Sequence, residues 1–214
     1  MNRGRLRLLH LREELEAAEE EMEAEREAYS ALKDREAVRA VSAFNLFQTP
    51  EPIAAMMAER LASLVDLQTA RILEPSAGLG RLYRAVRAIA PQSYITLVEI
   101  APQCARELYV STEGDQNCRL IQEDWLAVTP ERVGLYGAVL MNPPFKNGRD
   151  LKHIGHAYEH LQPGGAIVAL CYAGPRQRAE FENVNGWNWE TLPARSFRTE
   201  GTGADVAMIW RVKP

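Results

Sequence analysis

The stretch Ile72-Leu73-Glu74-Pro75-Ser76-Ala77-Gly78-Leu79-Gly80 is typical of a buried strand that runs into a glycine turn and then a helix. Glycine adopts backbone conformations that side chains disfavour, so such a turn lets the backbone approach a ligand closely. In doubly wound α/β proteins this turn lies at the carboxyl edge of the sheet, where nucleotides bind. A dinucleotide-binding fingerprint would have a third glycine at position 83, where this chain has Tyr83. The stretch therefore predicts a nucleotide-type site and disfavours NAD, and a purely structural turn is the other interpretation.

Short apolar runs alternate with helix-like segments on both sides of this turn. Strands are expected at 71–74, 94–99, 119–122, 136–141 and 166–171. Helices are expected from Thr49-Pro50, where the threonine can cap and the proline suits the first turn, from Leu79, from Pro102 and over 151–161. Two further strands, 191–195 and 206–212, resemble an antiparallel hairpin at a sheet edge. This alternation predicts a Rossmann-like, doubly wound α/β fold with a mostly parallel sheet and an antiparallel edge hairpin.

The N-terminal region differs from the rest of the chain. Residues 4–41 contain no proline and no glycine after Gly4, and Leu8, Leu15, Met22 and Tyr29 recur every seven residues. This heptad spacing predicts one long N-terminal helix with an apolar seam. We therefore divide the chain into a helical arm, 1–43, and a catalytic domain, 44–214. The arm forms a homodimer or contacts a partner in one interpretation, and folds back on its own domain in the other.

Composition limits the class of protein. The hydrophobic content is 46% and no apolar run approaches the roughly 18 residues that span a bilayer, so we expect a cytoplasmic protein without membrane insertion. Three cysteines, Cys104, Cys118 and Cys171, lie far apart, which argues against a zinc knuckle or a disulfide framework. The net charge is -4, and only residues 141–214 are net basic, with 9 Lys and Arg against 7 Asp and Glu. Any contact with a polyanion must therefore be local.

Acidic side chains follow the next two predicted strands. Glu99 ends the second strand, nineteen residues beyond Gly80, where a carboxylate accepts hydrogen bonds from a ribose diol. Asp124 and Trp125 follow the third strand and offer an acceptor for an adenine amino group and a plane for stacking. In the alternative interpretation Asp124 caps a turn and Trp125 anchors the core. The acid at position 99 predicts a cofactor that contains adenosine, without identifying it.

The segment Asn142-Pro143-Pro144-Phe145 ends the fourth predicted strand. The two prolines remove backbone donors and fix φ, which makes the segment a rigid support for its side chains. An adenine amine is a poor nucleophile, because its lone pair is delocalised into the ring. The Asn142 side-chain oxygen and the Pro143 carbonyl can accept its two N–H bonds, while Phe145 stacks on the ring and favours the developing positive charge. The motif therefore predicts methylation of an exocyclic amino group.

In order and spacing, five segments resemble the successive motifs of class I amino-methyltransferases, particularly the gamma group of DNA adenine N6-methyltransferases and small phage or mobile-element relatives. The segments are 44–57, 73–80, 98–100, 123–125 and 142–145. The resemblance covers about residues 44–212 and implies the class I methyltransferase fold, S-adenosylmethionine as cofactor and no metal. One departure from the gamma group is that no separate target-recognition domain follows the core. Sequence specificity is therefore loop-encoded, delegated to a partner or nearly absent.

The same resemblance implies roles for individual residues. The catalytic motif is formed by Asn142, Pro143, Pro144 and Phe145. The substrate is contacted by Phe145, Lys146 and Phe197, of which Phe197 would supply the opposite stacking face. The cofactor is held by Thr49, Glu74, Pro75, Ser76, Ala77, Gly78, Gly80, Glu99, Ile100, Asp124, Trp125 and Asn142.

Several substrates pose the same chemical problem to this motif. Nucleic acid is the expected partner, with DNA favoured over RNA. RNA purines and the glutamine side chain of a protein are the alternatives, and Phe145 favours nucleic acid because the protein-glutamine enzymes typically have tyrosine there. A different class of hypothesis is a non-catalytic, methyltransferase-like protein that recruits a partner through its N-terminal helix.

Two clusters of side chains leave an interpretation open. His153, His156 and His160 share a helix face and could bind a metal, but solvent-exposed or packing histidines are the favoured interpretation, since no cysteine or acid cluster lies near them in the sequence. Basic residues after the fourth and fifth strands form either a rim of phosphate contacts or ordinary surface charge. The basic residues are Lys146, Arg149, Lys152, Arg176 and Arg178.

Overall fold

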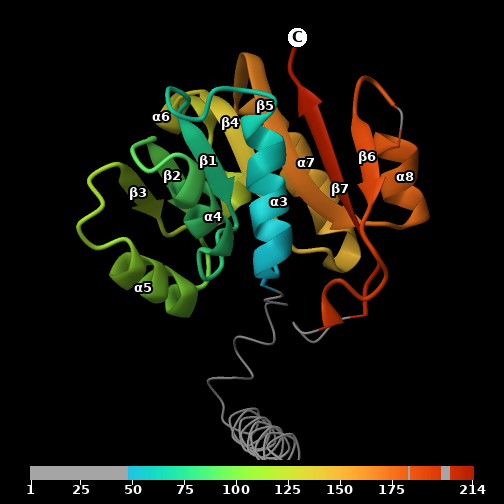
Figure 1. Cartoon of the computed structure of the whole chain (residues 1–214), viewed down its shortest axis with the longest axis horizontal. Coiled ribbons are helices and arrows are strands. Elements are labelled where there is room, and N and C mark those ends of the chain that lie inside the picture. Colours follow the sequence, from blue (N-terminus) through green and yellow to red (C-terminus); the bar gives the residue numbers. More distant parts are fainter. Residues whose placement is uncertain (1–47, 183, 199–202) are drawn as a thin grey trace, which may run out of the picture. The chain divides into compact units, whose positions relative to one another are not determined.

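The computed structural model describes residues 48–182, 184–198 and 203–214, and the helix predicted over 4–41 lies outside these ranges. A seven-stranded sheet in the order β3-β2-β1-β4-β5-β7-β6 forms the centre of the described domain (Figure 1). The five strands from β3 to β5 pair in parallel, and β7 is antiparallel to both β5 and β6. The predicted doubly wound, mostly parallel sheet with an antiparallel edge is confirmed.

The central parallel strands are buried, as expected for strands that are covered on both faces, whereas β3 at the edge of the sheet is partly exposed. The strands are β1 (Ile72–Pro75), β2 (Ile95–Val98), β3 (Cys118–Ile121), β4 (Tyr136–Met141), β5 (Leu161–Tyr172), β6 (Asn188–Thr191) and β7 (Val206–Val212). Every residue of β1, β2 and β4 is buried.

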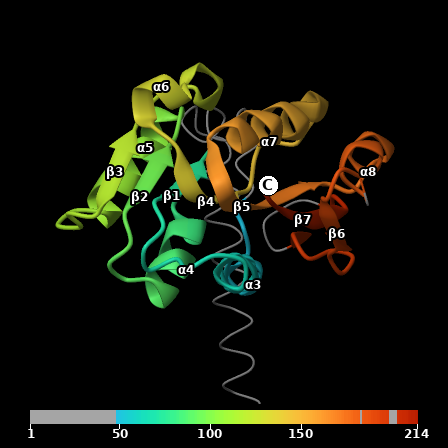
Figure 2. The ribbon, with the colours of Figure 1, turned by 90° about the horizontal axis from the view of Figure 1, so that it is seen from above.

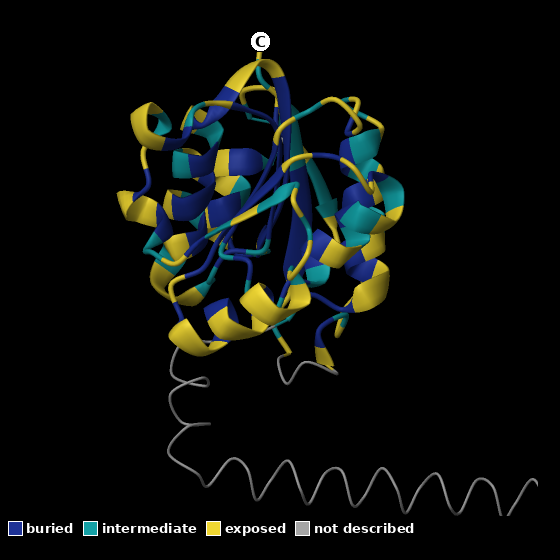
Figure 3. Cartoon of the chain, turned by 90° about the vertical axis from the view of Figure 1, so that its left-hand side faces the viewer, coloured by how far each residue is buried: buried dark blue, intermediate teal, exposed yellow. Residues whose placement is uncertain are grey.

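Helices cover both faces of the sheet (Figure 2). The α-helices are α3 (Glu51–Ala62), α4 (Arg81–Ile89), α5 (Pro102–Ser111), α6 (Pro130–Val133), α7 (Arg149–Glu159) and α8 (Pro175–Phe181), and the 3-10 helices are η1 (Trp125–Ala127) and η2 (Lys146–Gly148). The first core cluster packs α3, α4 and Leu108 of α5 against one face of the sheet. The second packs α6, α7 and α8 against the other face. The buried residues concentrate in the sheet between these layers (Figure 3).

Two local predictions are wrong. Thr49 does not cap α3, because the N-cap is Pro50 and no side chain makes a capping hydrogen bond there. The sixth strand is Asn188–Thr191 instead of 191–195. Pro193 lies inside the predicted range and has no N–H to donate to a neighbouring strand, so pairing with β7 stops before it.

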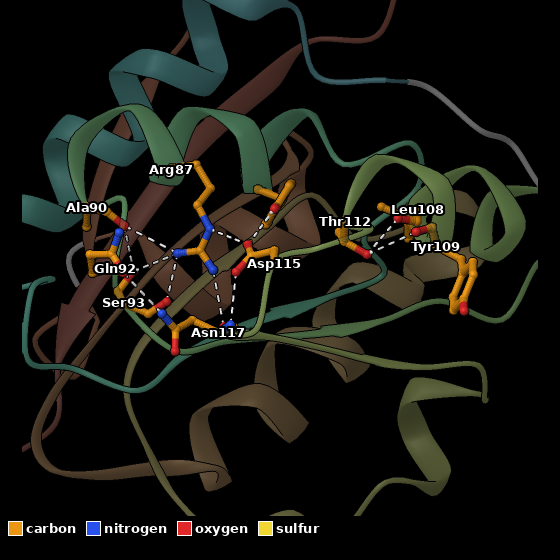
Figure 4. Close-up of polar contacts among 10 residues, drawn as sticks. Arg87, Ala90, Gln92, Ser93, Leu108, Tyr109, Thr112, Asp115 and Asn117 are labelled. Atoms are coloured by element: carbon orange, nitrogen blue, oxygen red, sulfur yellow. Dashed lines mark hydrogen bonds and ion pairs between the residues drawn. The ribbon is translucent and has the colours of Figure 1, made fainter.

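A partly buried ion pair connects α4 to the loops that lead into β2 and β3 (Figure 4). Arg87 Nε lies 2.7 Å from Asp115 Oδ2, and its two Nη atoms donate to the carbonyls of Ser93 and Asn117. The Tyr83 hydroxyl donates to the same Asp115 oxygen. Burial raises the pKa of Asp115, but hydrogen bonds from Tyr83 and Arg87 outweigh burial and lower it overall.

We expect Arg87→Ala to lower the free energy of unfolding by about 2 kcal/mol, since it removes the cation beside a partly buried carboxylate and the side-chain donor to the Ser93 carbonyl. Arg106→Ala, which removes an exposed arginine from α5, is the control and should change stability by less than about 0.5 kcal/mol. Urea denaturation of both variants measures the difference. Equal midpoints for the two variants would show that the pair does not stabilise the fold.

Candidate active site

The carboxyl ends of β1, β2 and β4 meet at one edge of the sheet, and the glycine turn follows β1 there. Ser76, Gly78 and Gly80 all have positive φ, at 62°, 57° and 76°. A Cβ on Gly80 would lie 2.8 Å from Leu108 Cδ2, so a side chain is excluded by space as well as by backbone conformation. The N–H groups of Ala77, Gly78 and Gly80 donate to the Val98 carbonyl, the Glu99 carboxylate and the Ala77 carbonyl, so the turn is held in one shape. Its glycines leave room for a ligand to approach the backbone closely.

Glu99 fastens this turn to the end of β2. Its two carboxylate oxygens accept from the backbone N–H groups of Gly78 and Ala101, each at 2.7 Å. Burial raises the pKa of Glu99, and the hydrogen bonds from Ala101 and Gly78 oppose that rise. A carboxylate has about four lone-pair positions, so Glu99 can hold the turn and still accept from a ribose diol. The sequence indicated the ribose role but gave no sign of the contact with the turn.

The Glu74 side chain is more deeply buried than expected for a residue that contacts a ligand. Its side chain is 3% exposed at the end of β1. Burial raises its pKa well above the ordinary value, although a hydrogen bond from the Tyr83 backbone and the charge of Arg84 oppose the rise. Tyr83 belongs to the first turn of α4, where N–H groups lack helical partners. Glu74 therefore positions the start of α4, next to the glycine turn that follows β1.

Asn142 directly follows β4, next to β1. Its Nδ2 donates to the Thr49 hydroxyl at 3.1 Å, although Thr49 is 93 residues earlier in the chain. Thr49 is buried just before α3. The bond fixes the plane of the Asn142 amide, so that its carbonyl oxygen has one direction in which to accept from a target amine. Both residues were predicted to lie at the site, but this pairing was not.

The rest of the motif passes from β4 into α7. Pro143 is buried, Pro144 and Phe145 are half-buried, and Lys146 is exposed at the start of η2. Phe145 packs against the first core cluster, which contains α3. The motif thus presents an aromatic edge and a cation beside the Asn142 amide.

The residues after β2 and β3 differ in exposure. Ile100 is 45% exposed and follows Glu99, as suits a side chain that contacts the flat face of a base. The Asp124 side chain caps η1 by accepting from the Leu126 N–H. Trp125 is buried and its Nε1 donates to the His153 carbonyl. These contacts favour the interpretations of Asp124 as a cap and of Trp125 as a core anchor.

His156 of α7 and His160, which caps its C-terminus, pack against this tryptophan. The rings of His156 and His160 lie 4.7 Å and 4.6 Å from the Trp125 ring, between centroids. His153 is buried, and its Nδ1 lies 3.3 Å from the hydroxyl of Ser76, which belongs to the glycine turn after β1. In the described ranges, no group of three or more His, Cys, Asp or Glu side chains is arranged to hold a metal ion. His153 thus connects α7 to the turn after β1.

Stability should fall as pH falls because of His153. Burial and the charge of Arg149 lower its pKa from 6.5 to about 4, although Asp124 opposes them. A depressed pKa contributes stability above pH 6.5 that is lost toward pH 4, by up to about 3 kcal/mol. Glu74 and Glu99 have raised pKa values and act in the opposite direction. Comparing denaturation of wild type and His153→Gln from pH 7 to 4 isolates the histidine, and parallel curves would contradict its role.

Two polar residues near the site carried no sequence signal. Asp150, in the first turn of α7, is fully buried and accepts from the Tyr172 backbone N–H at 3.0 Å and from Gln177 Nε2 at 2.9 Å. An acid in the first turn of a helix is usually a solvated charge, so only the tertiary contacts reveal its role. These bonds connect α7 to the end of β5 and to α8.

Phe197 does not present an open stacking face. Its ring is fully buried in the first core cluster, with Leu192 and Val206. The predicted contact between Phe197 and a target base would therefore require the ring to leave this packing.

In the parts of the chain that the structure describes, no helix has the length and apolar character needed to cross a bilayer.

Comparison with known proteins agrees with this geometry. A family model described as Methyltransferase small domain matches residues 53–183. A release factor glutamine methyltransferase of Salmonella typhimurium is 23% identical over 122 residues, which are 56% of this chain and 43% of that protein. The match thus spans less than half the length of this relative.

Solved structures share the fold at low identity. One is a candidate RNA methyltransferase from Pyrococcus horikoshii, with a TM-score of 0.62, 18% identity, and coverage of 78% of this chain and 86% of that one. The 23S rRNA methyltransferase ErmE has a TM-score of 0.57, 18% identity, and coverage of 78% and 70%. Together with the strand order, these likenesses confirm the predicted class I methyltransferase fold.

Proposed function

Because this chain belongs to the methyltransferase small domain family, we propose that it is an S-adenosylmethionine-dependent N-methyltransferase whose leading target is adenine N6 in DNA. The observation that carries the proposal is the bond from Asn142 to Thr49, which fixes an amide beside the cofactor turn. The family match supports methyl transfer. The target is the part of the proposal that rests on the chemistry of the motif.

The cofactor binds along the carboxyl edge of β1 and β2. The turn after β1 would lie against the methionine moiety, Glu99 would accept from the ribose and Ile100 would contact the adenine. Glu74 acts indirectly, because it positions the first turn of α4. When bound, the sulfonium supplies an electrophilic methyl group.

The chain's own residues orient the acceptor. The Asn142 side-chain oxygen and the Pro143 carbonyl accept the two N–H bonds of the target amine, which directs its lone pair toward the methyl group. Methyl transfer would break the methyl–sulfur bond of the cofactor as the C–N bond forms, leaving a neutral thioether. The nitrogen would become positive, and these acceptors would bind it more strongly. The amine then loses a proton to solvent and becomes neutral again. Phe145 stacks on the ring and favours the cationic state.

Exposed basic residues support a nucleic-acid substrate. Lys146, Arg149 and Lys152 follow the catalytic motif, and Arg176 follows β5, all of them exposed. Arg178 instead pairs with Glu182 at 2.8 Å. In this proposal the four exposed cations contact phosphates beside the site, which makes the contact with the polyanion local in a chain whose net charge is -4.

Removing one of these cations should weaken DNA binding without affecting the cofactor. We expect Lys146→Ala to weaken binding to all DNA sequences by about threefold to tenfold, and to reduce the slope of log affinity against log salt by about 1. Arg195→Ala, an exposed cation after β6, is the control. Fluorescence anisotropy at several salt concentrations measures both. An unchanged slope would exclude a phosphate contact at Lys146.

A second candidate function is methylation of a glutamine side chain in a protein. The Salmonella typhimurium relative favours it, because that protein is a release factor glutamine methyltransferase. A planar amide nitrogen would use the same acceptors as an adenine amine. A non-catalytic role would be separated from both by calorimetry, since it does not require the cofactor to bind.

Methyl-labelled cofactor tests the proposal against these alternatives. Double-stranded DNA, single-stranded DNA, RNA and protein extracts are incubated with the enzyme, and label is counted in each. The proposal expects label in DNA above RNA and protein. Label in protein alone would support the glutamine alternative. Absence of label together with absence of cofactor binding by calorimetry would favour the non-catalytic role.

A further inference from the structure

We propose that the ring of Tyr172 forms the second aromatic wall of the target pocket, opposite Phe145, and selects a planar base. This inference rests on the proposed function and deepens it. Tyr172 is the last residue of β5, and its side chain is 43% exposed, whereas Phe197 is fully buried.

The sheet register places Tyr172 beside the catalytic motif. β4 and β5 are parallel neighbours, with Met141 opposite Ala169, so β5 continues past the point where Asn142 leaves β4. With strands about 4.8 Å apart and a rise of about 3.3 Å per residue, the Cα atoms of Tyr172 and Asn142 are about 8 Å apart. The pleat puts Tyr172 on the same face of the sheet as Leu170, a member of the first core cluster. Phe145 packs against that same cluster.

A buried clamp holds the backbone of this exposed residue. The Asp150 carboxylate accepts from the Tyr172 N–H at 3.0 Å and is itself held by Gln177 Nε2. Asp150 follows the catalytic motif by five residues, so the clamp fixes the end of β5 relative to the segment that carries Phe145. Burial raises the pKa of Asp150, and its hydrogen bonds oppose that rise. A fully buried acid is thus used to fix the backbone position of an exposed aromatic residue.

Gly174 leaves space for the Tyr172 ring. A Cβ at Gly174 would lie 2.6 Å from Tyr172 Cε1 and 2.7 Å from Cδ1, so the ring lies directly over this glycine. The φ of Gly174 is -92°, which any residue adopts without strain. Glycine is therefore needed at position 174 to leave space for the Tyr172 ring, and not to allow an unusual backbone conformation. The ring over Gly174 offers a flat surface on which a base that has left its stack can pack.

The experiment uses the full chain with three variants: Tyr172→Ala removes the ring, Tyr172→Phe keeps its plane and Gly174→Ala displaces it. An oligonucleotide with 2-aminopurine at the target position reports stacking by quenching, and an adenine oligonucleotide gives kcat and KM. We expect Tyr172→Ala and Gly174→Ala to weaken binding of the oligonucleotide about tenfold and to leave the 2-aminopurine fluorescence of the complex less quenched than in wild type. Tyr172→Phe should match wild type within about twofold, and the Kd of S-adenosylmethionine should not change in any variant.

Each outcome has one interpretation. Wild-type binding and quenching in Tyr172→Ala, or in Gly174→Ala if the first does not fold, would overturn the inference. Loss in Tyr172→Phe as severe as in Tyr172→Ala would also overturn it, because the hydroxyl and not the ring would then matter. If 2-aminopurine quenching depends on Tyr172 but no adenine is methylated, the inference about Tyr172 stands and the proposed function is refuted. If adenine is methylated equally well with and without the Tyr172 ring, the proposed function stands and the inference is refuted.

Discussion

Asn142→Ala should lower kcat for methyl transfer by about 100-fold to 1,000-fold while the Kd of S-adenosylmethionine stays within about twofold. Asn142 acts on the amine, and its interaction strengthens as positive charge develops, so its loss is felt mainly in the chemical step. Single-turnover kinetics and calorimetry measure the two quantities separately.

Thr49→Val provides a matched test of the same geometry. It removes the hydroxyl that accepts from Asn142 Nδ2 but keeps a side chain of similar shape. We expect a smaller fall in kcat, about tenfold, because the amide is still present but is no longer held in one plane. An Asn142→Ala enzyme with wild-type turnover would show that the amide does not act on the reacting amine.

Glu99→Ala should weaken the binding of S-adenosylmethionine by about 1–3 kcal/mol, or about fivefold to 150-fold. Two causes act together: the ribose acceptor is lost, and the N–H groups of Gly78 and Ala101 lose the carboxylate that holds the turn. Calorimetry measures affinity, and thermal unfolding shows how far the turn itself is destabilised.

Glu107→Ala, an exposed acid on α5, is the control for the change in charge and should bind the cofactor as wild type does. The assignment of this site would be contradicted if Glu99→Ala bound S-adenosylmethionine as tightly as wild type. Competition by NAD for the same site would contradict it as well.

The sequence predicted features that depend on neighbouring residues. The fourth strand was expected over 136–141 and is Tyr136–Met141, because an unbroken apolar run ends at Asn142 and two prolines. The glycine turn was likewise readable, since positive φ at Gly78 and Gly80 is a local requirement. Helix α8 was missed, because its seven residues are too short to show a helical period.

Contacts between distant residues could not be predicted in this way. Thr49 looked like a helix cap, and only the fold reveals that it accepts from Asn142. Asp150 carried no signal in the sequence, and only the fold reveals that its carboxylate accepts from the end of β5 and from helix α8. Phe197 matched a family motif by position, but packing places its ring inside the core. Spacing in the sequence indicates which element carries a residue and not which side chains the fold brings to it.

The position of the transferred methyl group tests the central claim most directly. DNA is methylated with labelled cofactor by wild type and by Asn142→Ala, digested to nucleosides and analysed by mass spectrometry. The account predicts N6-methyladenine from wild type and its loss from Asn142→Ala. A methyl group on carbon C5 of cytosine, or N6-methyladenine formed equally by Asn142→Ala, would contradict it.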